Sequence, residues 1–111
     1  MKIADKCYHM LWICALSLLT IGVYMAFWNS PPDYQQGDTV RIMYIHVPAA
    51  YLSVKGYLVV SIASLIFLIW KNPFSFIVAR SCAHIGIAFC AICLLSGALW
   101  GQPMWGTWWV W

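Results

Sequence analysis

Three long apolar stretches, separated by shorter polar segments, dominate the hydrophobic pattern of this chain. They cover about residues 10–28, 48–70 and 81–100. Each approaches the ~20 residues that an α-helix needs to cross the hydrocarbon core of a bilayer. In lipid, a spanning segment must satisfy its backbone hydrogen bonds internally, so we expect these stretches to be helices. The pattern predicts an all-α integral membrane protein with three transmembrane helices, forming a single membrane domain over residues 1–111.

Composition supports a membrane protein and excludes several other classes. Of the 111 residues, 64% are hydrophobic and 8% are charged, whereas about a quarter of the residues of a soluble domain are charged. The net charge of +3 comes from scattered Lys and Arg, and without a basic patch nothing indicates nucleic-acid binding. The sequence shows no paired carboxylates, nucleophile with a base or phosphate-binding loop, so we expect no enzyme active site.

The charged residues of the connecting segments predict an orientation. Arg41, Asp33 and Asp38 fall in the segment of residues 29–47. The opposite side holds four cations and one acid: Lys2, Lys6, Lys71, Arg80 and Asp5. By the positive-inside rule, the N-terminus and the loop of residues 71–80 face the cytoplasm. The segments of residues 29–47 and 101–111, and with them the C-terminus, then lie outside.

His46 is the polar residue best suited to bind a ligand. It is expected at the outer mouth of the second helix, just before Pro48, a residue that fits the first turn of a helix. The short apolar run of residues 40–45 is expected to lie along the membrane interface. A neutral imidazole can bind iron. From spacing alone, a polar anchor at the interface is the more common role, because one histidine makes no metal site.

The sequence allows more than one role for the other polar and sulfur-bearing residues inside the apolar stretches. Lys55 and His84 are candidates for an anionic partner and for a helix-end contact, respectively. Cys90 and Cys93 form a C-x-x-C within an apolar run. Inert packing is favoured over redox chemistry, because reactive thiols need a polar, accessible setting.

Tryptophan is concentrated at the end of the chain. Trp28 and Trp70 fall at predicted helix ends, where aromatic belts form. Five more fall within the last twelve residues: Trp100, Trp105, Trp108, Trp109 and Trp111. Pro103 and Gly106 argue against a helix continuing through this segment. A short turn would lay the indoles side by side and suit a flat, mostly apolar ligand; composition supports a dense aromatic belt equally well.

Two motifs resemble those of a known family. Residues 101–111, GQPMWGTWWVW, resemble the tryptophan-rich "WWD" signature of haem-handling membrane proteins. Residues 34–50, YQQGDTVRIMYIHVPAA, resemble the segment that leads into the second helix of the haem exporter protein C family of cytochrome c maturation. The two motifs occur in the family's order, and the resemblance extends over nearly the whole chain.

The resemblance implies a function and a set of site residues. Members of the family have six membrane helices, hold non-covalent haem b on the outer face, and load it onto a periplasmic haem chaperone beside an ABC transporter. His46 matches an axial ligand of the haem iron. The aromatic residues beside the porphyrin match Trp105, Trp108, Trp109 and Trp111. Arg41 is a candidate partner for a haem propionate. A bacterial inner membrane is expected, with the mitochondrial inner membrane as the alternative.

The sequence also departs from the family pattern. The family motif continues with an aspartate beyond Trp111, and the second external histidine and three further helices lie in the half of the pattern that this chain does not include. Tyr51 stands where the family has tryptophan. We therefore expect half of a haem site. The alternatives are a non-catalytic membrane anchor or assembly subunit, an inactive fragment, and a haem lyase or thiol oxidoreductase that uses Cys90 and Cys93.

Overall fold

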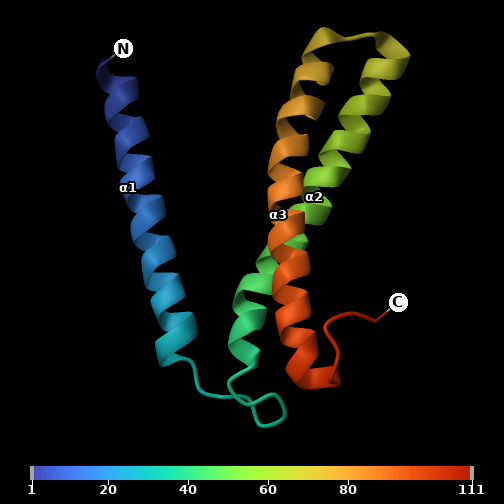
Figure 1. Cartoon of the computed structure of the whole chain (residues 1–111). Helices are drawn as coiled ribbons and strands as arrows, with labels where there is room; N and C mark the ends of the chain where they lie inside the picture. The colour runs from blue at the N-terminus through green and yellow to red at the C-terminus, as the bar shows by residue number, and fades with distance from the viewer. Residues whose placement is uncertain (1, 111) are drawn as a thin grey trace.

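The structure is a computed structural model that describes residues 2–110, and these residues form three long helices (Figure 1). Helix α1 covers Lys2–Tyr24 and continues into a π-helical turn, η1, at Met25–Asn29. Helices α2 and α3 cover Val40–Trp70 and Pro73–Trp105. All three are long and apolar enough to cross a membrane, with a mean hydropathy of 2.1 over their most apolar windows. The prediction of an all-α, multi-pass membrane protein is confirmed.

Helices α2 and α3 form an antiparallel hairpin with a two-residue connection (Figure 1). Lys71 ends α2 in the left-handed conformation, with φ of 51°, and its N–H donates to the Phe67 carbonyl at 2.8 Å. Asn72 starts α3, because its side chain accepts a hydrogen bond from the Phe74 N–H at 2.9 Å. Pro73 follows at the first helical position, where a backbone N–H would have no acceptor within the helix, so proline loses no hydrogen bond there.

Small residues bring the two helices of the hairpin together. Among the described residues, the buried ones are all small: Ala49, Ser53, Ala63, Ser75, Gly86, Ser96 and Gly101. At the crossing, a Cβ atom built on Gly56 would lie 3.2 Å from the Cα atom of Gly86. Close packing through small residues is typical of helix pairs in membranes, where lipid removes the hydrophobic drive for association.

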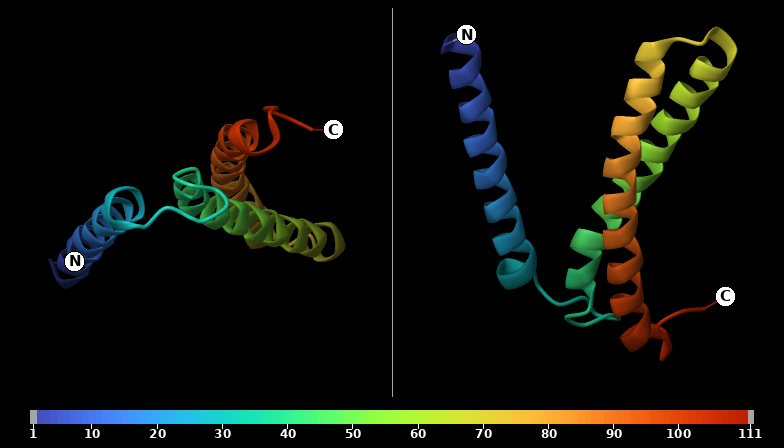
Figure 2. Two further views of the ribbon diagram at one scale, coloured as in Figure 1. Left: turned by 90° about the horizontal axis from the view of Figure 1, so that it is seen from below. Right: turned by 45° about the horizontal axis from the view of Figure 1, so that its top comes forward.

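Helix α1 stands apart from the hairpin along most of its length (Figures 1 and 2). None of its most apolar window is buried. Near the η1 end, a groove of about 700 Å³ separates it from the hairpin, with Leu19 and Tyr44 on opposite walls. A helix that is apolar on all faces fits lipid or further protein helices rather than water.

The helices extend further than the apolar stretches indicate. Residues 40–45 belong to α2, which begins at Val40 and has Pro48 within it, and their place at the membrane interface stays a prediction. Helix α3 begins at Pro73, well before residue 81, and includes Pro103. Proline carries a helical φ and removes only one N–H, and membrane helices tolerate it. A helix can also continue beyond the bilayer, so the predicted spans themselves stay predictions.

The connections gather at two ends of the molecule. The start of α1 and the Lys71–Asn72 turn lie at one end (Figure 1). The loop of residues 30–39 and the segment after Trp105 lie at the other. Helices α2 and α3 run in opposite directions, so the chain returns after two crossings and the neighbourhood of His46 lies at the same end as the tryptophan-rich segment. Which end faces the cytoplasm stays a prediction.

Candidate functional site

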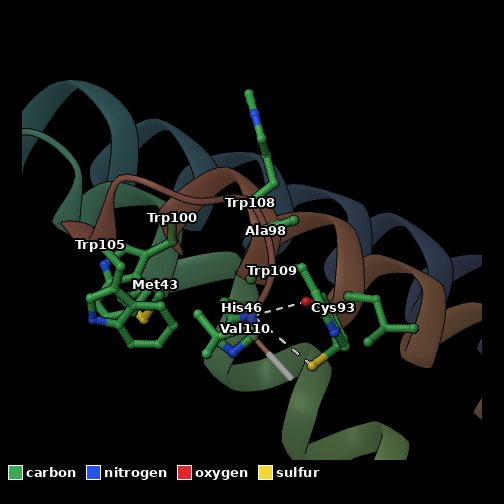
Figure 3. A pocket seen from close by; sticks show the side chains of 11 residues that line it. Met43, His46, Cys93, Ala98, Trp100, Trp105, Trp108, Trp109 and Val110 are labelled. Atoms are coloured by element: carbon green, nitrogen blue, oxygen red, sulfur yellow. Dashed lines mark hydrogen bonds between the residues drawn. The ribbon is translucent and has the colours of Figure 1, made fainter. Parts of the chain in front are cut away.

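A cavity of about 380 Å³ opens between the two helices of the hairpin and the segment that follows α3 (Figure 3). Among the described residues, its lining is aromatic, aliphatic and sulfur-bearing, with one imidazole and no charged side chain: Met43, His46, Cys93, Leu94, Gly97, Ala98, Trp100, Trp105, Trp108, Trp109 and Val110. We call this cavity the indole pocket. Three separate parts of the chain build it, so it depends on the packing of α2 against α3.

His46 is held in the indole pocket by hydrogen bonds to α3. It is the seventh residue of α2, two turns inside the helix rather than just ahead of it. Its Nδ1 lies 3.0 Å from the Cys93 carbonyl oxygen (Figure 3). The same Nδ1 lies 3.1 Å from the Ser96 Oγ. A carbonyl oxygen only accepts, so Nδ1 carries the hydrogen and donates it. The tautomer assigned by this network leaves the lone pair on Nε2.

The tryptophan-rich segment folds back over the end of α3. Gly106 ends the helix with φ of 76°, and its N–H donates to the Gln102 carbonyl at 2.9 Å. Left-handed glycine at this position is a common helix stop. The buried Gly101 makes room for the fold-back, since a Cβ built there would lie 3.4 Å from the Thr107 carbonyl oxygen. Gly106 therefore acts as predicted, whereas Pro103 does not end the helix.

The indoles of the pocket keep much of their surface open. Trp105, Trp108 and Trp109 are 64%, 59% and 50% exposed. Trp100 is half-buried, meets Trp105 edge to face with ring centroids 5.0 Å apart, and donates from Nε1 to Gln36 Oε1 at 2.9 Å. That hydrogen bond ties the loop of residues 30–39 to α3. The exposed rings offer apolar contact area with polar N–H edges.

The structure brings most of the predicted site residues together. His46, Trp105, Trp108 and Trp109 all line the indole pocket. Trp111 lies outside the described residues.

Arg41 is placed elsewhere and is already engaged. Its Nη2 lies 3.0 Å from Asp38 Oδ1 and 3.3 Å from the Ser30 carbonyl oxygen. Its Nε is buried without a hydrogen-bond partner among the described residues. Arg41 does not line the indole pocket, so a contact with a ligand there requires a change in its ion pair with Asp38.

The other candidates bond locally. His84 Nδ1 lies 2.9 Å from the Arg80 carbonyl oxygen of its own helix. His84 is the twelfth residue of α3, not near its start. The Lys55 ammonium lies 5.1 Å from the Tyr51 ring centroid, a cation–π contact. None of these groups lies in the indole pocket.

The sequence reasoning missed several residues of the pocket. Met43 lies three positions before His46, a spacing that places both on one helix face once α2 is extended to Val40. Cys93 and Gly97 show the same pattern on α3, four positions apart. Cys93 Sγ lies 4.0 Å from His46 Nδ1, whereas Cys90 is not in the lining. The sequence shows which of these residues share a face of their own helix, but it does not show that the two faces pack against each other.

The donor set limits what the pocket can bind. Within residues 2–110, no group of three or more His, Cys, Asp or Glu side chains could hold a metal ion. One imidazole cannot retain a bare metal ion, which needs several protein ligands. It can add one bond to a metal that arrives with its other coordination positions filled. The pocket therefore fits a flat, apolar metal complex better than a free ion.

Comparisons with known proteins agree with this chemistry. The family described as Heme exporter protein C matches the chain over residues 1–111. The Heme exporter protein C of Bradyrhizobium diazoefficiens is 51% identical over 102 residues, and that of Escherichia coli K12 is 44% identical over 99 residues. A putative cytochrome c biosynthesis ccmC-like mitochondrial protein of Marchantia polymorpha is 43% identical over 94 residues.

These matches cover most of this chain but less than half of each relative. They include 90%, 89% and 85% of the chain in that order. The chain spans 38%, 40% and 41% of the relatives' own lengths. Matching over the full 111 residues and identities above 40% show common descent. The chain belongs to the haem exporter protein C family.

Proposed function

We propose that this chain binds haem at the outer face of an inner membrane and takes part in haem delivery during cytochrome c maturation. The observation that carries the proposal is an imidazole in a pocket walled by indoles, with an Nε2 that makes no hydrogen bond to any of residues 2–110. The names of the relatives, which are haem exporters and a cytochrome c biosynthesis protein, support the same assignment.

Each part of the indole pocket has a role in this proposal. The His46 Nε2 supplies one axial ligand to the haem iron. Trp105, Trp108 and Trp109 contact the macrocycle through their exposed rings. Because no charged side chain lines the pocket, contact area and one coordinate bond provide the binding, without a net electrostatic contribution from the lining.

Release of haem follows from the same geometry. Within residues 2–110, His46 is the one histidine that lines the indole pocket, so a second ligand to the iron must come from water, from a partner or from a longer form of the protein. A partner that offers a competing ligand can then take the haem without displacing two bonds from this chain. We assign that role to a periplasmic haem chaperone, with an ABC transporter as the further partner of the system.

The proposal extends to the cargo and its surroundings. The cargo is haem b held without a covalent bond, and the chain acts as a transport component rather than as a catalyst. Arg41 would meet a propionate after exchanging its Asp38 partner, which lies 3.0 Å away. The membrane is a bacterial inner membrane, in keeping with the bacterial relatives, with the mitochondrial inner membrane as the counterpart of the Marchantia polymorpha relative.

The test is the visible absorption spectrum of the 111-residue chain, purified in detergent from haem-replete cells, beside its His46→Ala variant. We expect a Soret band in the parent chain and its loss in the variant, because the variant lacks the only imidazole of the indole pocket. His84→Ala is the matched control, since His84 bonds its own helix away from the pocket. It should keep the parent spectrum.

The opposite results are equally informative. An equal Soret band in the parent chain and in His46→Ala would remove the ligand role of His46. No band in any of the three proteins would refute haem binding by this chain and favour the membrane anchor or assembly role.

A further inference from the structure

The ring of His46 packs against the backbone of α3 at Gly97. A Cβ atom built on Gly97 would lie 2.9 Å from His46 Cε1 and 3.4 Å from His46 Nδ1. Real Cβ atoms essentially never make contacts as short as the first. Any residue other than glycine would therefore push the imidazole away from α3. Glycine is a poor helix former, so its position inside α3 is best explained by this packing.

The hydrogen-bond acceptors of His46 lie on the same face of α3. Cys93 is four positions before Gly97, and Ser96 directly precedes it. The Cys93 carbonyl lies 3.0 Å from Nδ1, and it can accept this bond in addition to a helix bond because a carbonyl has two lone pairs. Ser96 Oγ donates to the Ile92 carbonyl at 2.6 Å, which leaves its own lone pairs free to accept from Nδ1 at 3.1 Å.

These contacts constrain both the position and the protonation of the imidazole. The Nδ1–H must lie toward the α3 backbone, since only then do the carbonyl and the hydroxyl both receive a donor. Within the described part of the chain, Nε2 makes no hydrogen bond. Removing the close approach at Gly97 would lengthen both Nδ1 contacts together.

We propose that Gly97 is the positioning residue for His46: it admits the ring to the Cys93 carbonyl and thereby sets the tautomer that presents Nε2 as the iron ligand. The proposal rests on the haem-binding function proposed above. A hydrogen bond from the second ring nitrogen fixes the orientation of a metal-binding histidine and raises its basicity. Gly97 has no side chain that could bind the iron, and it acts through the imidazole.

The first test compares the haem affinity of the parent chain with that of Gly97→Ala. Loss of the hydrogen bond that orients a metal-binding histidine weakens metal binding by about 10- to 100-fold. We expect the haem affinity of Gly97→Ala to fall by a factor in this range. Gly22→Ala is the matched control, because Gly22 also lies in an apolar helix and a Cβ there meets nothing within 4 Å. Alanine favours helix in both variants, so a loss confined to Gly97→Ala comes from the added contact with His46 and not from helix propensity.

The second test reads the tautomer without haem. Nitrogen-15 NMR of the histidine-labelled chain in detergent, at a pH where imidazole is neutral, separates Nδ1–H from Nε2–H rings. His46→Ala identifies the His46 signal among the three histidines. We expect Nδ1–H in the parent chain and in Gly22→Ala, and a mixture of tautomers in Gly97→Ala.

The two tests separate failure of this inference from failure of the proposed function. An Nε2–H ring in the parent chain would overturn the inference even if haem binds. So would unchanged haem affinity in Gly97→Ala when His46→Ala has lost its haem. If the parent chain binds no haem, the proposed function fails, and the NMR result alone decides whether Gly97 sets the tautomer.

Discussion

At the scale of single residues, the indole pocket depends on one imidazole from α2 and several indoles from the end of the chain. His46 is fixed by acceptors on α3, whereas Trp105, Trp108 and Trp109 leave half or more of their side chains exposed. The two kinds of residue therefore contribute differently. The imidazole adds one directional bond, and the indoles add area and ring contacts.

The ring contacts can be measured by removing two indoles at once. Trp108→Leu combined with Trp109→Leu keeps apolar side chains but loses the flat faces. An aromatic contact is worth about 0.5–1.5 kcal/mol beyond its buried area. Loss of two such contacts is worth about 1–3 kcal/mol. We therefore expect haem affinity to fall by about 5- to 150-fold, since about 1.4 kcal/mol corresponds to a tenfold change in affinity.

The matched control replaces tryptophans away from the pocket. Trp28→Leu combined with Trp70→Leu removes two indoles that do not line it. Equal haem affinity in the Trp108/Trp109 double variant, the control and the parent would show that the tryptophans are only an aromatic belt. Haem titration in detergent, followed at the Soret band, provides the comparison.

The residues of the pocket were predictable to different degrees. His46 and the tryptophans stand out in the sequence because their motifs resemble those of a known family. Met43, Cys93 and Gly97 do not stand out, since each is an ordinary residue of an apolar helix. Only the register between α2 and α3 reveals that they face His46, and a single sequence carries no direct signal of that register.

At the scale of elements, the hairpin is organised by the close crossing of α2 and α3. Gly56 and Gly86 approach so closely that a Cβ on Gly56 would lie 3.2 Å from the Gly86 Cα atom. This neighbour is backbone, which cannot rotate away as a side chain can. The crossing is therefore the point at which the hairpin is least tolerant of added volume.

Gly56→Leu tests that crossing. Overpacking of a well-packed contact costs about 1–3 kcal/mol, so we expect the variant to unfold at a lower temperature and to lose the indole pocket as the helices separate. Thermal unfolding in detergent, followed by circular dichroism, measures the change. Gly22→Leu on α1 is the control, because nothing lies within 4 Å of a Cβ there. If both variants unfolded at the parent temperature, the crossing would not limit the stability of the hairpin.

Helix existence was predictable, and helix ends were less so. The three apolar runs are long enough that lipid leaves helix as the favoured backbone structure. The ends depend on local chemistry instead. The Asn72 side chain caps α3 and Gly106 stops it, whereas Pro48 and Pro103 lie within helices. A proline inside a helix removes one backbone hydrogen bond, and because membrane helices tolerate that loss, proline alone does not mark a boundary.

At the scale of the whole molecule, the two ends of the three-helix arrangement carry different kinds of side chain. The end with the Lys71–Asn72 turn also holds the lysine-bearing start of α1, whereas the other end holds His46 and the indole pocket (Figure 1). The positive-inside rule assigns the first end to the cytoplasm. The proposed delivery of haem to a periplasmic partner requires that orientation.

Cysteine labelling can determine the orientation. In a background with the native cysteines replaced by serine, Tyr34→Cys and Asn72→Cys place one thiol at each end. A membrane-impermeant maleimide added to spheroplasts should label Tyr34→Cys at once and Asn72→Cys only after lysis. Tyr34 is 90% exposed, so poor access does not explain a failure to react. The reverse labelling pattern would invert the predicted orientation and contradict an outward-facing pocket.

The two-residue connection of the hairpin has a consequence for changes in chain length. His46 lies 25 positions before Lys71, and Gly97 lies 25 positions after Asn72. A one-codon deletion in the intervening part of α2 would turn His46 by about 100° and slide it by about 1.5 Å relative to Gly97. Such a deletion should abolish the pocket as completely as loss of the histidine itself, although every side chain of the pocket is still encoded. A codon added in the loop of residues 30–39 precedes both partners and leaves their alignment unchanged. Between His46 and Gly97, the number of residues thus matters to the pocket as much as any functional side chain.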